Sequence, residues 1–459
     1  MTSYRRVATL KTPSALAEHL AQIGVDLPCD DQVQTGADAP LAQPVRLPDG
    51  VLIGNRWAIL PMEGWDGTLD GRPSELTFRR WQRFGASGAK LIWGGEAAAV
   101  RHDGRANPNQ LLVNEATLGD LAALREALVA EHETQWPSSD LLIGLQLTHS
   151  GRYSNPDGDF QPKIFSDNPV LEEPVRAGLS AGLRPGFFSD SEIDVVKKAY
   201  IEGINLAEQA GFNAFDVKAC HGYLLHEMLY AYDRTDSRYG GSYENRTRFL
   251  RDVLNTPSKI IKSMRLSAFD LIPYPHGFGM SPDGSQDIEL SEVRKLITEF
   301  SPMVPLWNIT AGVPRHAAHI GRPYDRGAFD SPPPGEHPLE GIARLIRITG
   351  KLQQSFPTLF FVGSGYSWLR QFYPNVGAGA LNQGKASFIG LGRSSFAYPD
   401  TPKDLMQKGK LDVKKVCVSC SKCTEFMRLG GPTGCGVRDG RYKAGGQKGR
   451  RAESKESGN

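Results

Sequence analysis

Eight short apolar runs, separated by helical patterns, constrain the fold of this chain more than any other feature of the sequence. The runs are WAILPM, KLIWGG, LLIGLQL, NAFDVKA, SMRLSAF, VPLWNIT, LFFVGSG and ASFIGLGR, and segments such as SEIDVVKKAYIEGINLAEQAG lie between them. Strands of this buried type that alternate with helices indicate a parallel sheet. Eight such units predict an α/β fold, a closed (β/α)8 TIM barrel, which needs about 250 residues. The chain of 459 residues can contain this barrel together with long loops.

Changes of composition along the chain predict four segments. We expect a loosely held N-terminal extension over residues 1–45, with one short helix from Ser14 to Ile23, and the barrel over residues 46–402. A Cys-rich segment follows over residues 403–436, and the polar, Gly-rich residues 437–459 are expected to form a disordered basic tail. Within the barrel, residues 151–188 and 312–338 are predicted to be long loops.

The charge and the cysteine content exclude several classes of protein. A formal net charge of +2 gives no general attraction to nucleic acid or to a membrane surface. The sequence has no signal-peptide type of apolar run at its start and no apolar stretch of membrane-spanning length, so we expect a cytoplasmic location. Six cysteines in so long a chain do not make a disulfide scaffold, and Cys29 and Cys220 are expected to be free thiols.

Polar residues at the carboxyl ends of the predicted strands indicate an active site, because barrel enzymes build their sites at that end. Gln146 lies in the third run, Lys218, His221 and Tyr223 lie at or after the end of the fourth, and Arg265 lies inside the fifth. A buried arginine needs an anionic or strongly accepting partner, and a reduced flavin would be one. A core carboxylate such as Asp216 could equally be that partner, and the histidines could be structural.

Two Gly-rich stretches, VGSGYS and GLGRSS, end the last two predicted strands. Backbone N–H groups in such loops point toward an anion, and Arg393 adds positive charge, so the loops predict a phosphate site. A single GSG turn after a strand is also a common structural feature. The functional interpretation is favoured because all these residues fall at the same end of successive strands.

Four of the six cysteines, Cys417, Cys420, Cys423 and Cys435, lie close together near the end of the sequence. Their spacing, C-x2-C-x2-C-x11-C, fits two kinds of centre. Zinc takes four thiolates, usually from two C-x2-C pairs. A [4Fe–4S] cluster typically takes three cysteines from one compact turn and a fourth from farther along the chain. The grouping of three plus one favours the cluster, and a structural zinc site is the alternative.

The segment HGYLLHEMLYAYDRTDSRYGGSYENRTRFLRDVL strongly resembles the fourth strand–helix unit of the old yellow enzyme (NADH:flavin oxidoreductase) family. PMEGWDG, QLTHSGR and MRLSAFD resemble three further motifs of that family, and VGSGYS and GLGR resemble its phosphate loops. The resemblance covers residues 55–402. It implies a barrel that binds FMN noncovalently at its C-terminal mouth.

The resemblance also implies roles for individual residues. The implied flavin contacts are Pro61, Met62, Glu63, Ala97, Gln146 and Arg265, and the implied phosphate contacts are Gly363, Gly365, Gly392 and Arg393. Lys218 and His221 would hold a substrate oxygen, and Tyr223 would deliver a proton. Lys218 stands where the family usually has a neutral histidine, and Glu63 stands where relatives have Thr or Cys. A cationic Lys218 would stabilise an oxyanion more strongly, provided that no carboxylate neutralises it.

The cysteine run is similar to that of the iron–sulfur branch of the family, which includes trimethylamine dehydrogenase and 2,4-dienoyl-CoA reductase. The resemblance therefore implies a [4Fe–4S] cluster beside the FMN. Those relatives continue into C-terminal nucleotide-binding domains, whereas this sequence ends after a short tail. We expect the cysteines to hold a one-electron relay, with a separate electron-transfer protein as its redox partner.

Three functions are compatible with these residues. The first is an ene-reductase that reduces an electron-poor C=C bond, with NADH or NADPH as the electron donor. The second is a dehydrogenase of an amine or similar small substrate, which passes electrons through the cluster to an external carrier. The third is a non-catalytic FMN and iron–sulfur electron-transfer subunit. We expect a small-molecule substrate, no nucleic-acid or membrane partner, and, as a further hypothesis, a homo-oligomer.

Overall fold

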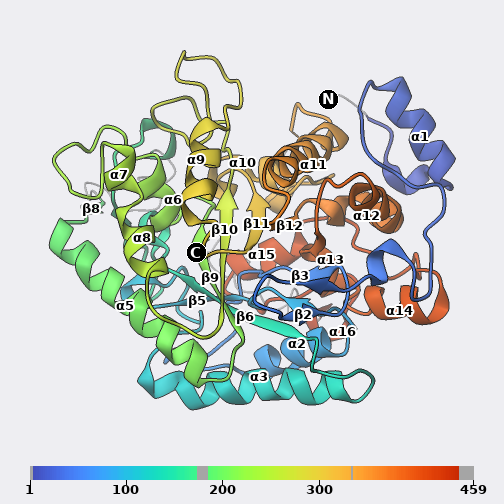
Figure 1. The fold of residues 1–459 in the computed structure, drawn as a ribbon, viewed down its shortest axis with the longest axis horizontal. Coiled ribbons are helices and arrows are strands. Elements are labelled where there is room, and N and C mark those ends of the chain that lie inside the picture. The colour runs from blue at the N-terminus through green and yellow to red at the C-terminus, as the bar shows by residue number, and fades with distance from the viewer. Residues whose placement is uncertain (1–3, 173–184, 332–333, 444–459) are drawn as a thin grey trace, which may run out of the picture.

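Eight parallel strands close into a barrel in the computed structural model, which describes residues 4–172, 185–331 and 334–443 (Figure 1). The barrel strands are β3 (Trp57–Ile59), β4 (Leu91–Ile92), β6 (Leu142–Thr148), β9 (Ala214–Ala219), β10 (Ile261–Ser267), β11 (Leu306–Thr310), β12 (Phe360–Gly363) and β13 (Phe388–Leu391). They pair in parallel around the ring, and the pairing of β4 with β6 closes it. Each of the eight apolar runs supplies one strand, so the predicted TIM barrel is confirmed.

One main helix follows each barrel strand and covers the outside of the barrel (Figure 1). These helices are α2 (Glu75–Gly85), α3 (Leu118–Glu133), α5 (Asp190–Gln209), α8 (Arg248–Leu254), α9 (Ser291–Phe300), α11 (Pro338–Ser355), α12 (Tyr373–Asn382) and α14 (Thr401–Lys408). Serine N-caps fix the starts of α2 and α5: Ser74 and Ser189 each accept a hydrogen bond from a backbone N–H of the first turn. Helix α14 continues past the predicted barrel boundary at residue 402 and ends at Lys408, where the C-cap Gly409 has a φ of +66°.

The N-terminal extension is packed against the barrel, and the prediction that it is loosely held was wrong. Helix α1 (Pro13–Gln22) matches the predicted helix to within one residue, and it buries Leu16 and Leu20 in the main core. Farther along the extension, Asp30 and Asn375 of α12 exchange two hydrogen bonds of 3.1 and 2.8 Å. The short antiparallel hairpin of β1 (Val45–Arg46) and β2 (Leu52–Ile53) then packs on the amino ends of the barrel strands.

Both predicted long loops contain some regular structure. The loop over residues 151–188 holds β7 (Lys163–Ile164) paired with β8 (Gly186–Phe187), and its residues 173–184 lie outside the described part of the chain. The loop over residues 312–338 holds the helix α10 (Pro314–Gly321). The remaining short elements are β5 (Ala97–Ala99), α6 (Leu224–Leu229), α7 (Tyr243–Arg246), α13 (Arg393–Ala397) and the 3-10 helices Val7–Thr9, Pro40–Ala42, His102–Gly104, Glu115–Thr117, Gly151–Tyr153, Ala328–Asp330 and Tyr366–Phe372.

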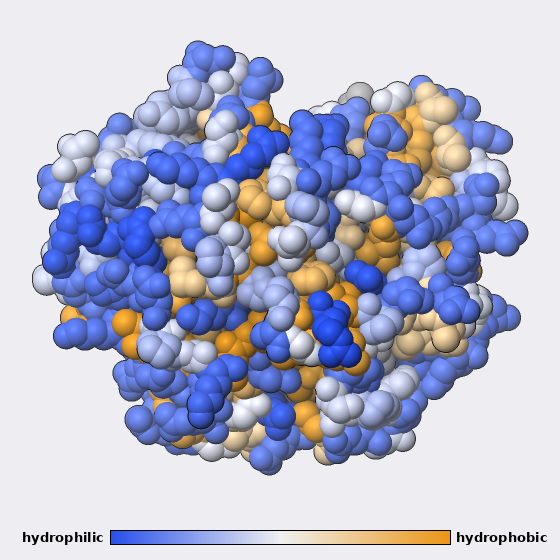
Figure 2. All heavy atoms as spheres, in the orientation of Figure 1, coloured by the Kyte–Doolittle hydropathy of each residue, from blue (hydrophilic) through white to orange (hydrophobic). Residues whose placement is uncertain are grey.

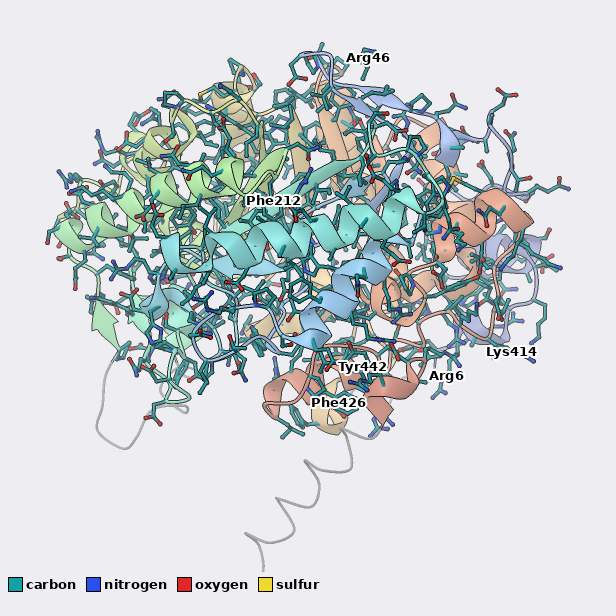
Figure 3. All side chains as sticks on the ribbon, turned by 90° about the horizontal axis from the view of Figure 1, so that it is seen from below. Arg6, Arg46, Phe212, Lys414, Phe426 and Tyr442 are labelled. Carbon is teal, nitrogen blue, oxygen red and sulfur yellow. The ribbon has the colours of Figure 1, made fainter. Side chains whose placement is uncertain are left out.

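The Cys-rich segment, residues 403–436, and the first residues after it are folded onto the barrel. Helix α15 (Lys422–Arg428) lies in this segment, and α16 (Gly440–Lys443) follows it. Figure 3 shows Phe426 and Tyr442 close together on this part of the chain, below α2 in that view. Tyr442 is 2% exposed, and Asp439 forms ion pairs with Arg79 (2.8 Å) and Arg83 (2.5 Å) of α2.

The predicted start of the disordered tail, at residue 437, is therefore too early. The buried tyrosine and the acidic residue between two arginines hold residues 437–443 in place, although their composition is polar and Gly-rich. The rest of the predicted tail, residues 444–459, lies outside the described residues. In the face shown in Figure 2, hydrophilic residues cover most of the periphery and hydrophobic residues gather toward the middle. No helix in the described part of the chain has the length and apolar character needed to cross a membrane.

A buried ion cluster joins α2, the loop after β3 and the Cys-rich segment. Arg80 of α2 is 4% exposed and pairs with both carboxylate oxygens of Asp66 (2.8 Å each) and with Glu96 (2.9 Å). The backbone N–H of Thr433 donates to the same Asp66 carboxylate at 3.0 Å, and Arg80 donates to the Thr433 carbonyl oxygen at 3.2 Å. The position of the segment that carries Cys435 thus depends on this guanidinium.

We predict that Arg80→Met destabilises the fold by about 3–5 kcal/mol, because it leaves two buried carboxylates without their cation. The free energy of unfolding from denaturant titration measures the effect. Arg79→Met is the matched control: its pair with Asp439 is partly exposed on the arginine side (36%) and Asp439 keeps Arg83, so we expect a loss of about 1 kcal/mol or less. Equal losses in the two variants would contradict a structural role for the buried cluster.

Candidate active site and cysteine centre

A cavity of about 190 Å³ lies at the carboxyl ends of the barrel strands. Eleven of the predicted active-site and cofactor residues line it: Pro61, Met62, Glu63, Gln146, Lys218, His221, Tyr223, Arg265, Gly365, Gly392 and Arg393. Ala97 and Gly363 are not among the lining residues. The carbonyl oxygen of Ala97 accepts a hydrogen bond from Gln110 (2.9 Å). At Gly363, the Tyr366 ring occupies the space that a side chain would need.

Lys218 is held by Glu63 beneath the mouth of the cavity. The two residues are 155 positions apart in the chain, and their side chains form an ion pair. The Lys218 ammonium also lies 3.5 Å from the centre of the Tyr223 ring. The sequence left open whether a carboxylate neutralises Lys218, and Glu63 does so in part. A paired lysine binds an oxyanion less strongly than a free one, but it remains a hydrogen-bond donor with a fixed position.

Tyr223 keeps its proton over the whole physiological range of pH. Burial, helped by the neighbouring Glu63 carboxylate, raises the pKa of Tyr223 well above its ordinary value of 10. The positive charge of Arg315 acts in the opposite direction without cancelling the effect. A protonated phenol that lines the cavity can donate a proton to a reacting atom, as the resemblance implied.

His221 is presented to the cavity by an unusual backbone turn. Its φ is +66° and that of Gly222 is +75°, so two successive residues are left-handed, and the His221 N–H donates to Ser267 Oγ at 3.2 Å. The ring nitrogen Nε2 lies 3.2 Å from Thr310 Oγ1. Burial lowers the pKa of His221 well below 6.5, and the charges of Arg265 and Lys218 lower it further. The imidazole is thus neutral and offers one N–H donor.

Arg265 is almost completely buried, and one of its donors has no partner. Its side chain is 8% exposed, and Nη1 donates to the Pro61 carbonyl oxygen at 2.9 Å. Its Nε is buried without a hydrogen bond. No ion pair joins Arg265 to Asp216 in the described chain, and Asp216 instead accepts a hydrogen bond from Gln146. The charge and the backbone N–H of Arg265 nevertheless act on Asp216, where they oppose the rise in pKa that burial causes. The unpartnered Nε is available to a ligand in the cavity.

A second arginine, Arg322, faces the cavity beside Arg393. Arg393 donates to the Pro323 carbonyl oxygen, but its Nη1 and the Nε of Arg322 are buried without partners. Burial and the charge of Arg393 lower the pKa of Arg322 to about 10, and no carboxylate of the described residues forms an ion pair with either cation. Gly365, with a φ of +96°, and Gly392 bring backbone into the same end of the cavity. This end fits a phosphate group.

Sequence analysis missed several residues of the cavity. Tyr153, Arg315, Arg322, Met427 and Arg428 all line it. They come from three loops or short helices that have no strand periodicity, so their approach to the strand ends depends on tertiary packing. The arginines Arg315, Arg322 and Arg326, which lie in the loop after the sixth strand, are a signal in the sequence that could have indicated Arg322.

The four clustered cysteines surround a second, smaller cavity of about 20 Å³. The turn that carries the first three is tightly coiled, because Ser419 and Ser421 both have positive φ values of +50° and +58°. Backbone N–H groups of Ser419 and Arg438 lie 3.4 and 3.3 Å from the sulfur atoms of Cys417 and Cys435. All six cysteines of the chain are free, as expected for Cys29 and Cys220. In the described residues, no three His, Cys, Asp or Glu side chains form a site for a single metal ion.

Cys423 and Arg393 line both cavities and form part of the wall between them. Burial and the neighbouring Cys417 raise the pKa of Cys423 to about 11. Thiolates at this position are therefore costly unless a cationic centre shares their negative charge. The donor set and its backbone N–H groups fit an iron–sulfur centre, and such a centre would lie directly beside the larger cavity.

The chain matches the NADH:flavin oxidoreductase / NADH oxidase family over residues 40–290, which is more than half of its length. With the barrel and the cavity described above, this match identifies the class: the chain belongs to that family of flavin oxidoreductases. The resemblance to old yellow enzymes is thereby confirmed at the level of the family.

Two curated relatives and one solved structure illustrate the similarity. The chain is 30% identical to the NADPH dehydrogenase of Geobacillus sp. (strain WCH70) over 49% of this chain and 62% of the relative. It is 26% identical to the dimethylamine dehydrogenase of Hyphomicrobium sp. (strain x) over 54% of this chain and 31% of the relative. Morphinone reductase has a similar barrel, with a TM-score of 0.58, 21% identity and coverage of 81% of this chain and 90% of that structure. The chain thus spans less than two thirds of the length of these two curated relatives.

Proposed function

We propose that the protein is an FMN-dependent oxidoreductase that uses NADH or NADPH to reduce an electron-poor C=C bond. The observation that carries this proposal is the single cavity at the barrel mouth, which gathers neutral His221, protonated Tyr223 and the unpaired donors of Arg265 and Arg393. The match to a family of NADH:flavin oxidoreductases supports it.

The cavity supplies what FMN needs from a protein. FMN, when bound, supplies hydride transfer between a nicotinamide donor and an electron-poor alkene. Arg265 would turn its unpaired Nε to the electron-rich edge of the flavin ring, and Gln146 would contact the ring from β6. Arg393, together with Gly365 and Gly392, would hold the phosphate. The unpartnered donors support this assignment, because a buried N–H without an acceptor costs about 1–3 kcal/mol.

The chain's own residues would act on the substrate as follows. His221 donates its N–H, and Lys218 donates from its ion pair with Glu63, to one oxygen of the substrate. Negative charge that develops on this oxygen is stabilised by both donors, each worth roughly 3 kcal/mol. Tyr223 gives its hydroxyl proton to the carbon that becomes electron-rich and is then reprotonated from water. Because the lowered pKa leaves the His221 ring uncharged, His221 has no imidazolium proton to give and does not compete with Tyr223 as the proton donor.

We further propose that Cys417, Cys420, Cys423 and Cys435 hold a [4Fe–4S] cluster. Zinc would draw four sulfur atoms onto one point, with Zn–S distances of about 2.3 Å. The four cysteines here are grouped as three plus one rather than as two C-x2-C pairs, and backbone N–H groups point at two of the sulfur atoms, which favours the cluster. A cluster bound by these four sulfur atoms would be separated from the flavin site by Cys423 and Arg393.

The shared wall also favours a second candidate, a dehydrogenase that passes electrons through the cluster to a separate carrier protein. The similarity of the chain to a dimethylamine dehydrogenase supports this second candidate.

The charge at the rim argues against an amine as the substrate: Arg315 and Arg428 are not assigned to the flavin, and Glu63, the only lining carboxylate in the described chain, is paired with Lys218. A protonated amine would be repelled, so a substrate oxidised here is expected to be neutral or anionic.

We predict about one FMN and about four irons per chain in protein purified without oxygen. Acid precipitation releases the flavin for identification, and metal and sulfide analysis measures the cluster. Cys420→Ala should lose the iron, whereas Cys29→Ala, which removes another free thiol, should keep it. One zinc per chain without iron would contradict the cluster, and protein that neither contains nor takes up FMN would contradict the flavin assignment.

We predict that His221→Ala lowers kcat/KM for the NAD(P)H-dependent reduction of 2-cyclohexenone by about 100-fold or more, because one of two oxygen donors is lost. Tyr223→Phe should lower kcat by about 100-fold and leave KM nearly unchanged, because a proton donor is lost but no ligand of the oxygen. Tyr274→Phe, on an exposed loop (37% exposed), is the matched control and should behave as the wild type. Wild-type rates in both site variants would show that the reaction occurs elsewhere.

A further inference from the structure

Two arginines at the mouth of the larger cavity are not needed for the proposed flavin site. Arg315 begins α10 next to Pro314, and Arg428 ends α15. Both line the cavity and both remain exposed to solvent at its rim. Neither forms an ion pair with a carboxylate of the described chain. Glu63, the one lining carboxylate there, is already bound to Lys218.

Arg315 is positioned directly beside the proposed catalytic residues. Its guanidinium lies 5.1 Å from the centre of the Tyr153 ring and 5.9 Å from that of Phe160. The Tyr153 and Tyr223 rings are in turn 6.1 Å apart. The positive charge of Arg315 acts to lower the pKa of Tyr223, which also indicates that the two residues are close. Stacking on aromatic rings fixes the planar guanidinium while its N–H groups stay free for a ligand.

Arg428 lines the same cavity as Arg315. It follows Met427, which also lines the cavity, in the helix that begins just before Cys423. Partial burial of this otherwise solvent-exposed side chain and the charge of Arg315 lower the pKa of Arg428, so the two like charges interact. Two guanidinium groups held near each other without a counter-charge repel, and an anion between them removes this repulsion.

We propose that Arg315 and Arg428 form a carboxylate-binding subsite, so that the substrate is a small anionic molecule with a carbonyl-type oxygen at His221 and a carboxylate at the rim. This assignment deepens the proposed function and rests on it for the position of the reacting oxygen. A planar carboxylate fits the fork of a guanidinium in two parallel hydrogen bonds, which makes arginine the suitable residue for it. A neutral amide of the same shape lacks the charge and should bind more weakly.

The test uses an unreactive probe that has both groups, 4-oxo-4-phenylbutanoate, and its primary amide as the neutral partner. Isothermal titration calorimetry on the purified flavin-containing protein measures both dissociation constants. We expect the wild type to bind the acid about 10- to 100-fold more tightly than the amide. Arg315→Met and Arg428→Met should each weaken the acid about 10-fold or more and leave the amide within about twofold. Arg428→Lys should restore part of the loss, because it restores the charge but not the fork.

Arg347→Met is the matched control, because Arg347 is an exposed arginine of α11 that does not line the cavity. Equal affinities of the wild type for acid and amide, or variants that bind the acid normally, would overturn the proposal. Titration with NADPH and NADH separates a second source of anion: variants that lose only NADPH would assign the arginines to its phosphate and would also overturn the carboxylate assignment. The FMN content of each preparation reports on the proposed function independently, so the two failures are distinguishable.

Discussion

The arrangement of both cavities depends on the buried guanidinium of Arg80. It forms ion pairs with two carboxylates. Asp66 lies in the loop after β3, and Glu96 lies just before β5. Through Asp66 it also fixes Thr433, two positions before Cys435. A single cation therefore ties the loop that lines the larger cavity to the segment that lines the smaller one.

The larger cavity is organised by positive charge that the protein itself leaves uncompensated. Lys218 is the exception, since Glu63 neutralises it and holds it against Tyr223. Unpaired N–H groups of Arg265, Arg322 and Arg393 lie in the interior, where they fit an anionic cofactor. Arg315 and Arg428 extend the same field to the rim. In a site of this kind, charge complementarity selects the ligand before any specific contact is made, and it favours anions over ammonium groups.

Local patterns in the sequence were sufficient for the barrel and for most of the candidate site. Each strand is a continuous apolar run, and residues such as Gln146 and Arg265 are placed by the strands that contain them. Contacts between distant segments could not be predicted in this way. Glu63 and Lys218 are separated by 155 residues. Arg428 reaches the cavity through long-range contacts of the Cys-rich segment, such as those of Thr424 with Arg322 and of Thr433 with Asp66. The packing of residues 437–443 could not be predicted for the same reason. Their composition is polar, and it does not indicate that Tyr442 is buried.

The proposed adjacency of a flavin and an iron–sulfur cluster can be tested most directly by anomalous diffraction at the iron absorption edge, from crystals grown without oxygen. We expect iron density in the cavity between Cys417, Cys420, Cys423 and Cys435, and flavin density in the cavity lined by Arg265 and Arg393. Cys423 should lie between the two groups. A single zinc ion at the cysteines, or a barrel cavity that holds no flavin in protein saturated with FMN, would contradict this arrangement.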